Sequence, residues 1–395
     1  MFRTYRSVLQ TPGSLAFSSA GLVGRVPASM TGLGIVLLIE TTMDSFTRAG
    51  LVAAVYILTS AVAAPMQGRI ADTFGQTRVL IFAPILYTIG IAFLLHGALN
   101  SLTIALVGAV VAGTGAPQTG NMVRTRWTHS LEDKELLGTA FAWEAILDEV
   151  VFIIGPVLVT FLTLNVDPRL GLVAAAVSAL AGAWLLAALQ STTPEPTRRR
   201  EIEKDPLNGF LLGMLIIAGI GVGVVFGSSE VLIVAFTDEL HEKHLAGWVL
   251  AASSIGSLLA GFVVGARPMA GEPLTHLRIY TLALTVALIP LPFLTTTGQL
   301  TIGMFVMGLT VAPTLITAVK LVERVTPLTR LTEALTWVST GLAGGVALGA
   351  AASGRVVDVA SASAGFYVVI IAAFSSMIVA MLTPISQTLD RSKNI

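Results

Sequence analysis

The sequence contains no cysteine and few charged residues. The absence of cysteine among its 395 residues excludes disulfide bonds, thiol catalysis and cysteine-based metal sites. Only 12% of the residues are Asp, Glu, Lys or Arg, whereas an ordinary soluble domain has about 25%. Bases and acids balance at 23 each, so the net charge gives no indication of a nucleic-acid partner.

The patterns of several enzyme classes are missing as well. No lysine follows a glycine, which excludes a phosphate-binding loop of the Gly-Lys type and makes nucleotide-driven pumping within this chain a poor hypothesis. Neither the Gly-x-Ser-x-Gly elbow of hydrolases nor a zinc-protease pattern occurs. We therefore expect no enzymatic activity, no cofactor and no metal site.

Hydrophobic residues make up 54% of the chain and gather in long apolar stretches. A helix needs about 20 such residues to cross ~30 Å of hydrocarbon. The sequence offers twelve of these stretches and predicts an all-α integral membrane protein with twelve transmembrane helices. The predicted spans are 14–39, 47–68, 78–98, 101–124, 137–164, 168–190, 208–237, 244–266, 275–296, 299–321, 331–354 and 364–386.

The longest connection, residues 191–207, is rich in proline and in charges of both signs. This composition is typical of a solvated linker, here between an N-terminal bundle of residues 1–190 and a C-terminal bundle of residues 208–395. If consecutive spans cross the membrane in alternating directions, most Lys and Arg residues lie on one side of it. By the positive-inside rule, we expect a multi-pass protein of the cytoplasmic membrane with both termini in the cytoplasm.

The two halves share spacings that indicate an internal repeat. A base follows an Ala-Pro pair in the fourth and the tenth spans, and a glycine follows a tryptophan in the fifth and the eleventh. The first pattern is Pro117 to Arg124 and Pro313 to Lys320, seven residues each, and the second is Trp143 to Gly155 and Trp337 to Gly349, twelve residues each. A repeat of six helices is what paired-bundle transporters are built from.

The stretch between the second and third spans has the pattern Gly-x-x-x-Asp-x-x-Gly followed by a base, on Gly68, Asp72, Gly75 and Arg78. With the twelve spans and the central linker, this pattern resembles the major facilitator superfamily of transporters over the whole chain. The resemblance implies two pseudo-symmetric six-helix bundles that alternate access to a cavity between them. It also implies that this loop latches the bundles on the cytoplasmic side, with Glu333 at the start of the eleventh span as its contact.

A narrower resemblance, to the drug/proton antiporter branch of that family, rests on two fragments. Gly113-x-Gly115-Ala116 is similar to the end of the branch's fourth-helix motif, and Gly155-Pro156 is similar to the core of its fifth-helix motif. The arginine of the first motif and the flanking glycines of the second are missing. The substrate therefore cannot be carried over from that branch.

Three acids, Glu144, Asp148 and Glu149, lie within the fifth span. A carboxylate in hydrocarbon costs roughly 3 kcal/mol or more unless it is paired, neutralised or facing water. Glu149 lies about twelve residues from the cytoplasmic entry, or ~18 Å deep, and Arg25 lies at a comparable depth in the first span. We predict a buried ion pair between Arg25 and Glu149, with Asp148 as the alternative partner.

The role of these acids has two interpretations. Burial favours the neutral form of a carboxyl group and a nearby arginine favours the ionised form, so Glu149 or a neighbour could take up and release a proton during transport. The alternative is a permanent structural salt bridge. For Glu144 we expect contact with cytoplasmic water. Glu230 in the seventh span is a further proton-coupling candidate, or else a residue that faces water in the outer vestibule.

The family resemblance implies that the first, fourth, seventh and tenth helices line the cavity. Polar, sulfur and aromatic side chains of these spans are the candidates for substrate contacts, although each of them can equally pack between helices. The candidates are Met30, Gln118, Asn121, Phe226 and Thr314.

These observations predict a monomeric secondary transporter whose partners are a small-molecule substrate, protons and the lipid bilayer. The antiporter fragments favour export in exchange for protons. Proton-coupled uptake of a polar metabolite by symport is the main alternative. A membrane receptor or scaffold that no longer transports is a weaker one, because the chain retains its acids within the membrane.

Overall fold

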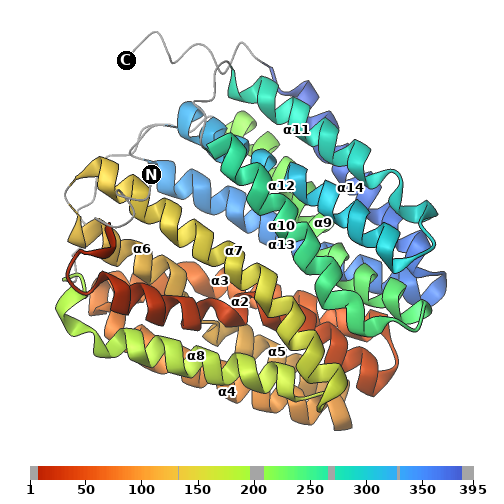
Figure 1. Cartoon of the computed structure of the whole chain (residues 1–395), viewed down its shortest axis with the longest axis horizontal. Coiled ribbons are helices and arrows are strands. Elements are labelled where there is room, and N and C mark those ends of the chain that lie inside the picture. The colour runs from red at the N-terminus through yellow and green to blue at the C-terminus, as the bar shows by residue number, and fades with distance from the viewer. Residues whose placement is uncertain (1–7, 132, 196–208, 266–271, 327–329, 385–395) are drawn as a thin grey trace. The chain divides into compact units, whose positions relative to one another are not determined.

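The computed structural model describes an all-helical chain, with no strand in the parts that it covers (Figure 1). The described residues are 8–131, 133–195, 209–265, 272–326 and 330–384. Twelve helical stretches among them are long and apolar enough to cross a membrane. The prediction of an all-α protein with twelve spans is confirmed.

The helices follow the predicted spans closely and extend several of them by a turn or more. In the first half they are α2 (Ser14–Met43), α3 (Phe46–Phe74), α4 (Gln76–Asn100), α5 (Leu102–Gly115), α6 (Thr119–Ser130), α7 (Lys134–Asn165) and α8 (Leu170–Ala188). In the second half they are α9 (Gly209–Glu239), α10 (Ala246–Gly265), α11 (Pro273–Leu288), α12 (Thr297–Val325), α13 (Leu331–Val359) and α14 (Ala362–Leu382).

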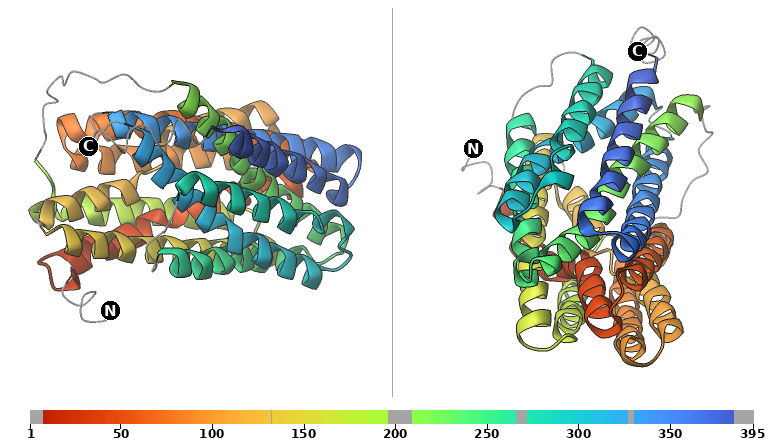
Figure 2. Two further views of the ribbon diagram at one scale, coloured as in Figure 1. Left: turned by 90° about the horizontal axis from the view of Figure 1, so that it is seen from above. Right: turned by 90° about the vertical axis from the view of Figure 1, so that its right-hand side faces the viewer.

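Contacts divide the chain into two compact units. The first contains residues 1–44 and 55–199, and the second contains residues 45–54 and 200–395. Within each unit the long helices lie alongside one another (Figure 2). Most of the predicted linker, residues 191–207, lies outside the described residues, so the proposed boundary between two bundles stays a prediction.

The start of α3 belongs to the second unit because an acid of α13 caps it. The Asp358 carboxylate accepts hydrogen bonds from the backbone N–H groups of Phe46 and Thr47, both at 2.9 Å, and from the Ser45 hydroxyl at 2.8 Å. The first N–H groups of a helix have no partner within the helix. Asp358 therefore satisfies the beginning of α3 from a neighbouring helix.

Glycines allow the first and fifth helices of each unit to approach closely. A Cβ atom at Gly155 of α7 would lie 2.0 Å from the Ser29 hydroxyl oxygen of α2, and one at Gly349 of α13 would lie 2.4 Å from the Val224 carbonyl oxygen of α9. Only glycine fits at such separations. The two glycines of the predicted repeat thus occupy the same kind of contact in the two units.

The fourth span is broken, whereas the sequence predicts a continuous helix over residues 101–124. α5 ends at Gly115 and α6 begins at Thr119. Pro117 lies in this gap, and a proline removes a helical hydrogen bond and clashes with the preceding turn. The equivalent Pro313 lies inside the unbroken helix α12, so proline alone does not decide the outcome.

Gln67 of α3 supports the break. Its amide nitrogen donates to the carbonyl oxygens of Thr114 at 2.9 Å and Ala116 at 3.1 Å. Its side chain is buried, with 7% exposed. Carbonyl groups freed within a membrane need a replacement donor, and Gln67 supplies it.

The Gly-x-x-x-Asp pattern is more helical than a loop. Gly68 and Asp72 lie within α3, which runs to Phe74, and the turn into α4 is made at Gly75 with φ +89°. Only glycine adopts such a φ without strain. The Arg78 guanidinium lies 5.6 Å from the centre of the Phe74 ring. The side chain of Glu333 lies outside the described residues, so the latch stays a prediction.

A mutation tests whether Gln67 stabilises the break in the fourth span. Gln67→Leu removes the donor shared by the carbonyl oxygens of Thr114 and Ala116 and leaves Ala116 with the Gln118 amide alone, and we expect the free energy of unfolding to fall by about 1–3 kcal/mol. Unfolding of the purified protein in detergent measures this loss. Gln190→Leu, at an exposed position of the same unit, is the control and should stay within about 0.5 kcal/mol. Equal stability of the two variants would contradict the assigned role of Gln67.

Candidate functional site

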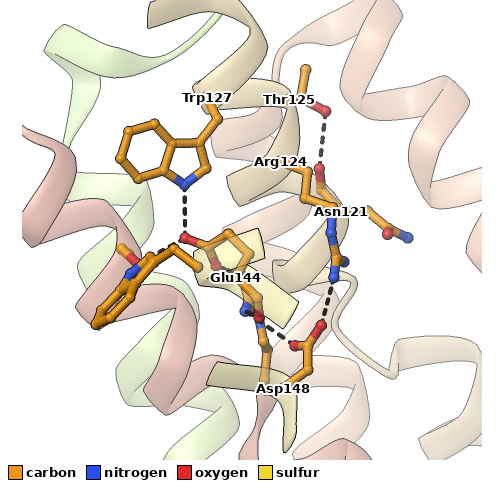
Figure 3. Close-up of polar contacts among 9 residues, drawn as sticks. Asn121, Arg124, Thr125, Trp127, Glu144 and Asp148 are labelled. Atoms are coloured by element: carbon orange, nitrogen blue, oxygen red, sulfur yellow. Dashed lines mark hydrogen bonds and ion pairs between the residues drawn. The ribbon is translucent and has the colours of Figure 1, made fainter. Parts of the chain in front are cut away.

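The acidic face of α7 meets basic residues of α2 and α6 inside the first unit. Glu144 and Asp148 are four residues apart and therefore share one face of the helix. Arg25 of α2 forms ion pairs with both, and its Nη1 lies 3.1 Å from an oxygen of Asp148. Figure 3 shows the two acids of α7 beside Arg124 and Trp127 of α6.

Glu144 is fully buried and held by three donors. Its Oε2 pairs with the Arg25 guanidinium, and its Oε1 accepts hydrogen bonds of 2.7 Å from the Ser18 hydroxyl and from the indole nitrogen of Trp127. Trp143 donates to the Ser18 hydroxyl oxygen at 3.1 Å. These donors hold the carboxylate in place, because hydrogen bonds to a charged group are stronger than those between neutral groups.

Asp148 bridges two arginines. One of its oxygens pairs with Arg25 and the other with Arg124. Arg25 is buried, with 6% of its side chain exposed, whereas Asp148 and Arg124 are 31% and 36% exposed. The cluster therefore has a buried part around Glu144 and a more open part around Asp148.

The predicted pair between Arg25 and Glu149 is wrong. Arg25 contacts Glu144 and Asp148, the second of which was the alternative partner. Adjacent residues of a helix are turned by about 100° from each other, so Glu149 does not share the face of Asp148. Glu149 is partly buried and makes no hydrogen bond or ion pair with any residue that the structure describes.

The expectation that Glu144 contacts cytoplasmic water is also wrong. The Glu144 side chain has 0% exposure. The reason is that Phe17 and Trp127 pack edge to face beside it, with ring centres 4.7 Å apart. The position of Glu144 along the helix predicts contact with water, but the side chains that pack around it exclude water.

The substrate-contact candidates of the first unit differ in exposure. Met30 is fully buried, and Gln118 is partly exposed at the break of the fourth span. Asn121 is exposed and donates to the Gln118 side-chain oxygen at 3.3 Å, so the two amides do share one face. Their contact with substrate remains a prediction.

The candidates of the second unit lie on α9 and α12. Phe226 and Glu230 are partly buried and four residues apart on α9. Thr314 is 1% exposed and donates to the Thr310 carbonyl oxygen at 2.7 Å. A hydroxyl that bonds its own helix is typical of a packing residue.

Sequence reasoning missed most of the partners of the acids. Arg124, Trp127 and Ser18 were not predicted as site residues. The signal that could have found Arg124 and Trp127 is their position seven and ten residues after Pro117, about two to three turns past the proline on the helix that continues the fourth span. Arg126 is a further residue that the sequence analysis does not single out; it is fully buried and donates to the Leu189 carbonyl oxygen at 2.8 Å.

The charge balance around Arg25 predicts the effect of Glu144→Gln. The variant keeps a hydrogen-bonding side chain but leaves a buried guanidinium without its main counter-charge. Removing one partner of a buried pair costs about 3–5 kcal/mol, and we expect a loss of unfolding free energy of this size in detergent. Asp167→Asn, in the connection after α7, is the control that should remain near wild type. A loss below about 0.5 kcal/mol in Glu144→Gln would show that the pair is not essential to stability.

Comparisons with known structures agree on the fold. A POT family transporter in complex with 5-aminolevulinic acid superposes with a TM-score of 0.76 at 12% identity, covering 94% of this chain and 96% of that one. The nucleoside transporter NupG gives 0.73 at 14% identity, covering 96% and 100%. A bacterial homologue of the iron transporter ferroportin, in an inward-facing state, gives 0.68 at 16%, covering 95% and 99%. At these identities the likeness shows the fold alone.

Comparison with sequences assigns the family. No curated protein matches the chain. The family model described as Major Facilitator Superfamily matches residues 17–267 and 210–394, which together span nearly the whole chain. The protein is a multi-pass membrane transporter that belongs to the major facilitator superfamily.

Proposed function

We propose that this protein is a proton-coupled secondary transporter of a small molecule and that Glu149 carries the proton. Membership of the superfamily establishes transport by alternating access. The observation that supports proton coupling is the unequal pairing of the three acids of α7. Glu144 and Asp148 have arginine partners, whereas Glu149 has none among the described residues.

The pairing matters because a proton carrier has to change its charge in each transport cycle. Glu144 is engaged in a buried ion pair with Arg25 and accepts two further hydrogen bonds, and breaking such a pair is costly. Glu149 can gain or lose a proton without breaking an ion pair. Ionisable groups within a membrane span mark proton pathways in many transporters, and Glu149 lies beside Asp148, so their charges influence each other.

Export by antiport is the direction that the sequence fragments favour. Gly113 and Gly155, which belong to the two antiporter-like fragments, are both close helix contacts in the first unit. A Cβ at Gly113 would lie 2.5 Å from the Tyr56 carbonyl oxygen, and one at Gly155 would clash with Ser29. The glycines of the two fragments therefore allow close helix packing in this protein, although they carry no information about its substrate.

Uptake by symport is the second candidate, and the charged groups around Asp148 suit the polar metabolite that it would carry. Two guanidinium groups share this one partly exposed carboxylate. An anionic metabolite could compete for these groups. The POT family transporter, which has the same fold, is described in complex with 5-aminolevulinic acid, a molecule with a carboxylate group.

Proton flux in vesicles tests the role of Glu149. Full-length protein is reconstituted with a trapped pH-sensitive dye, a pH gradient is imposed, and a compound panel is added on either side. The wild type should move protons in response to its substrate. Glu149→Gln should lose this flux, because an amide neither takes up nor releases a proton at neutral pH.

The matched control is Asp44→Asn, an exposed acid at the end of α2 whose φ of 50° asparagine tolerates. This variant should keep the wild-type proton flux. Substrate-driven proton flux of normal rate in Glu149→Gln would remove Glu149 from the coupling role. The sign of the flux relative to substrate movement distinguishes antiport from symport.

A further inference from the structure

Of the two acids that pair with Arg25, Asp148 is the one that another anion can replace. Glu144 is buried among three donors and belongs to the packing of the first unit. Among the described residues, the Asp148 carboxylate bonds to the two arginines alone, and its side chain is 31% exposed, close to the 36% of Arg124. Carboxylates that join two guanidinium groups in this way can be replaced by another anion of the same shape, because arginine recognises carboxylates by its planar fork of donors.

The broken fourth span adds a second positive element at this position. α6 begins beside the cluster, and the side chain of its N-cap residue, Gln118, makes no capping hydrogen bond. The N-terminus of a helix carries a partial positive charge and unpaired N–H groups. Half-helices of this kind direct their N-termini at anionic substrate groups in other membrane transporters.

Two buried polar atoms there lack partners. The Arg25 Nε and the Thr119 hydroxyl have no acceptor or donor within the described part of the chain, and Arg25 and Thr119 are 6% and 1% exposed. The Arg25 Nε lies beside the first turn of α6, because a Cβ added at Gly120 would lie 3.1 Å from it and 3.6 Å from an Arg124 nitrogen. Glycine at position 120 thus leaves both arginines close to the helix start.

We propose that Arg25, Arg124 and the first turn of α6 form a binding subsite for a carboxylate group of the transported molecule, and that Asp148 competes with this group for the two arginines. The proposal rests on the proposed transport function and names its substrate class. With Asp148 and Glu144 both ionised, the two arginines are already neutralised. An added anion therefore has to displace Asp148 from the two arginines.

The charge of Asp148 sets the affinity of this subsite for an anion. The charged groups that face Asp148 are Arg25 from α2, Arg124 from α6 and, one turn earlier on its own helix, Glu144. Replacing Asp148 by a neutral side chain of similar size frees a positive charge for the ligand and should strengthen anion binding.

Binding of a simple probe to the purified full-length protein in nanodiscs tests the subsite. Benzoate is the carboxylate probe, and benzyltrimethylammonium is a cation with the same ring. Titration calorimetry at fixed pH and low chloride should show that Asp148→Asn binds benzoate about tenfold more tightly than the wild type, since an internal competitor has been removed. Neither protein should gain affinity for the ammonium probe.

Arg124→Gln is the second variant, at a partly exposed position where folding is less at risk. It should weaken benzoate binding, and adding it to Asp148→Asn should cancel the gain. Asp167→Asn is the control outside the cluster and should bind as the wild type does. Thermal unfolding of each variant verifies that it is folded.

Unchanged or weaker benzoate binding in Asp148→Asn would overturn the proposal, as would the absence of benzoate binding in both proteins. Binding of the ammonium probe that depends on Asp148 would also overturn it, because Asp148 would then be a cation site. These failures are distinct from failure of the proposed function. Proton flux that requires Glu149 would still support proton-coupled transport if the carboxylate subsite were refuted.

Discussion

The first unit depends on neutralising charges inside an apolar bundle. Arg25 lies on a helix with hydrophobic neighbours, and a lone guanidinium there would be costly. Glu144 removes that cost, and Trp127 and Ser18 complete the hydrogen bonds that its oxygens require. Three helices, α2, α6 and α7, are thereby fixed relative to one another by one carboxylate. The remaining features of the site follow from this constraint, because Asp148 and Glu149 are placed by the same turn of α7.

The sequence predicts the fold well because the bilayer imposes strong rules. Apolar length gives the twelve spans, and the superfamily pattern around Gly68 and Asp72 identifies the family. The site is predicted less well. Depth along a helix can be counted from the sequence, and it correctly places Arg25 near the acids of the fifth span. The face of α7 that turns toward α2 cannot be found by counting residues. The sequence therefore predicts Glu149 rather than Glu144 as the partner of Arg25.

The break in the fourth span shows a second limit. Pro117 and Pro313 have the same local sequence pattern, yet only the first interrupts a helix. The difference lies in a tertiary contact, since Gln67 supplies donors for the freed carbonyl groups. No local rule contains that information. The break is also what brings Arg124 and the start of α6 to the acids, so a feature that the sequence did not predict determines the chemistry of the site.

The central claim is that Arg25 and Glu144 act as one neutral unit, and a double-mutant cycle tests it most directly. The free energy of unfolding is measured in detergent for Arg25→Leu, Glu144→Leu and the double variant. Arg25→Leu leaves Glu144 without a counter-charge, and Glu144→Leu leaves Arg25 with Asp148 as its remaining counter-charge. The account therefore predicts that the double variant loses much less stability than the sum of the single losses, with a coupling of about 2–3 kcal/mol. Additive losses would contradict it, because the two side chains would then contribute independently.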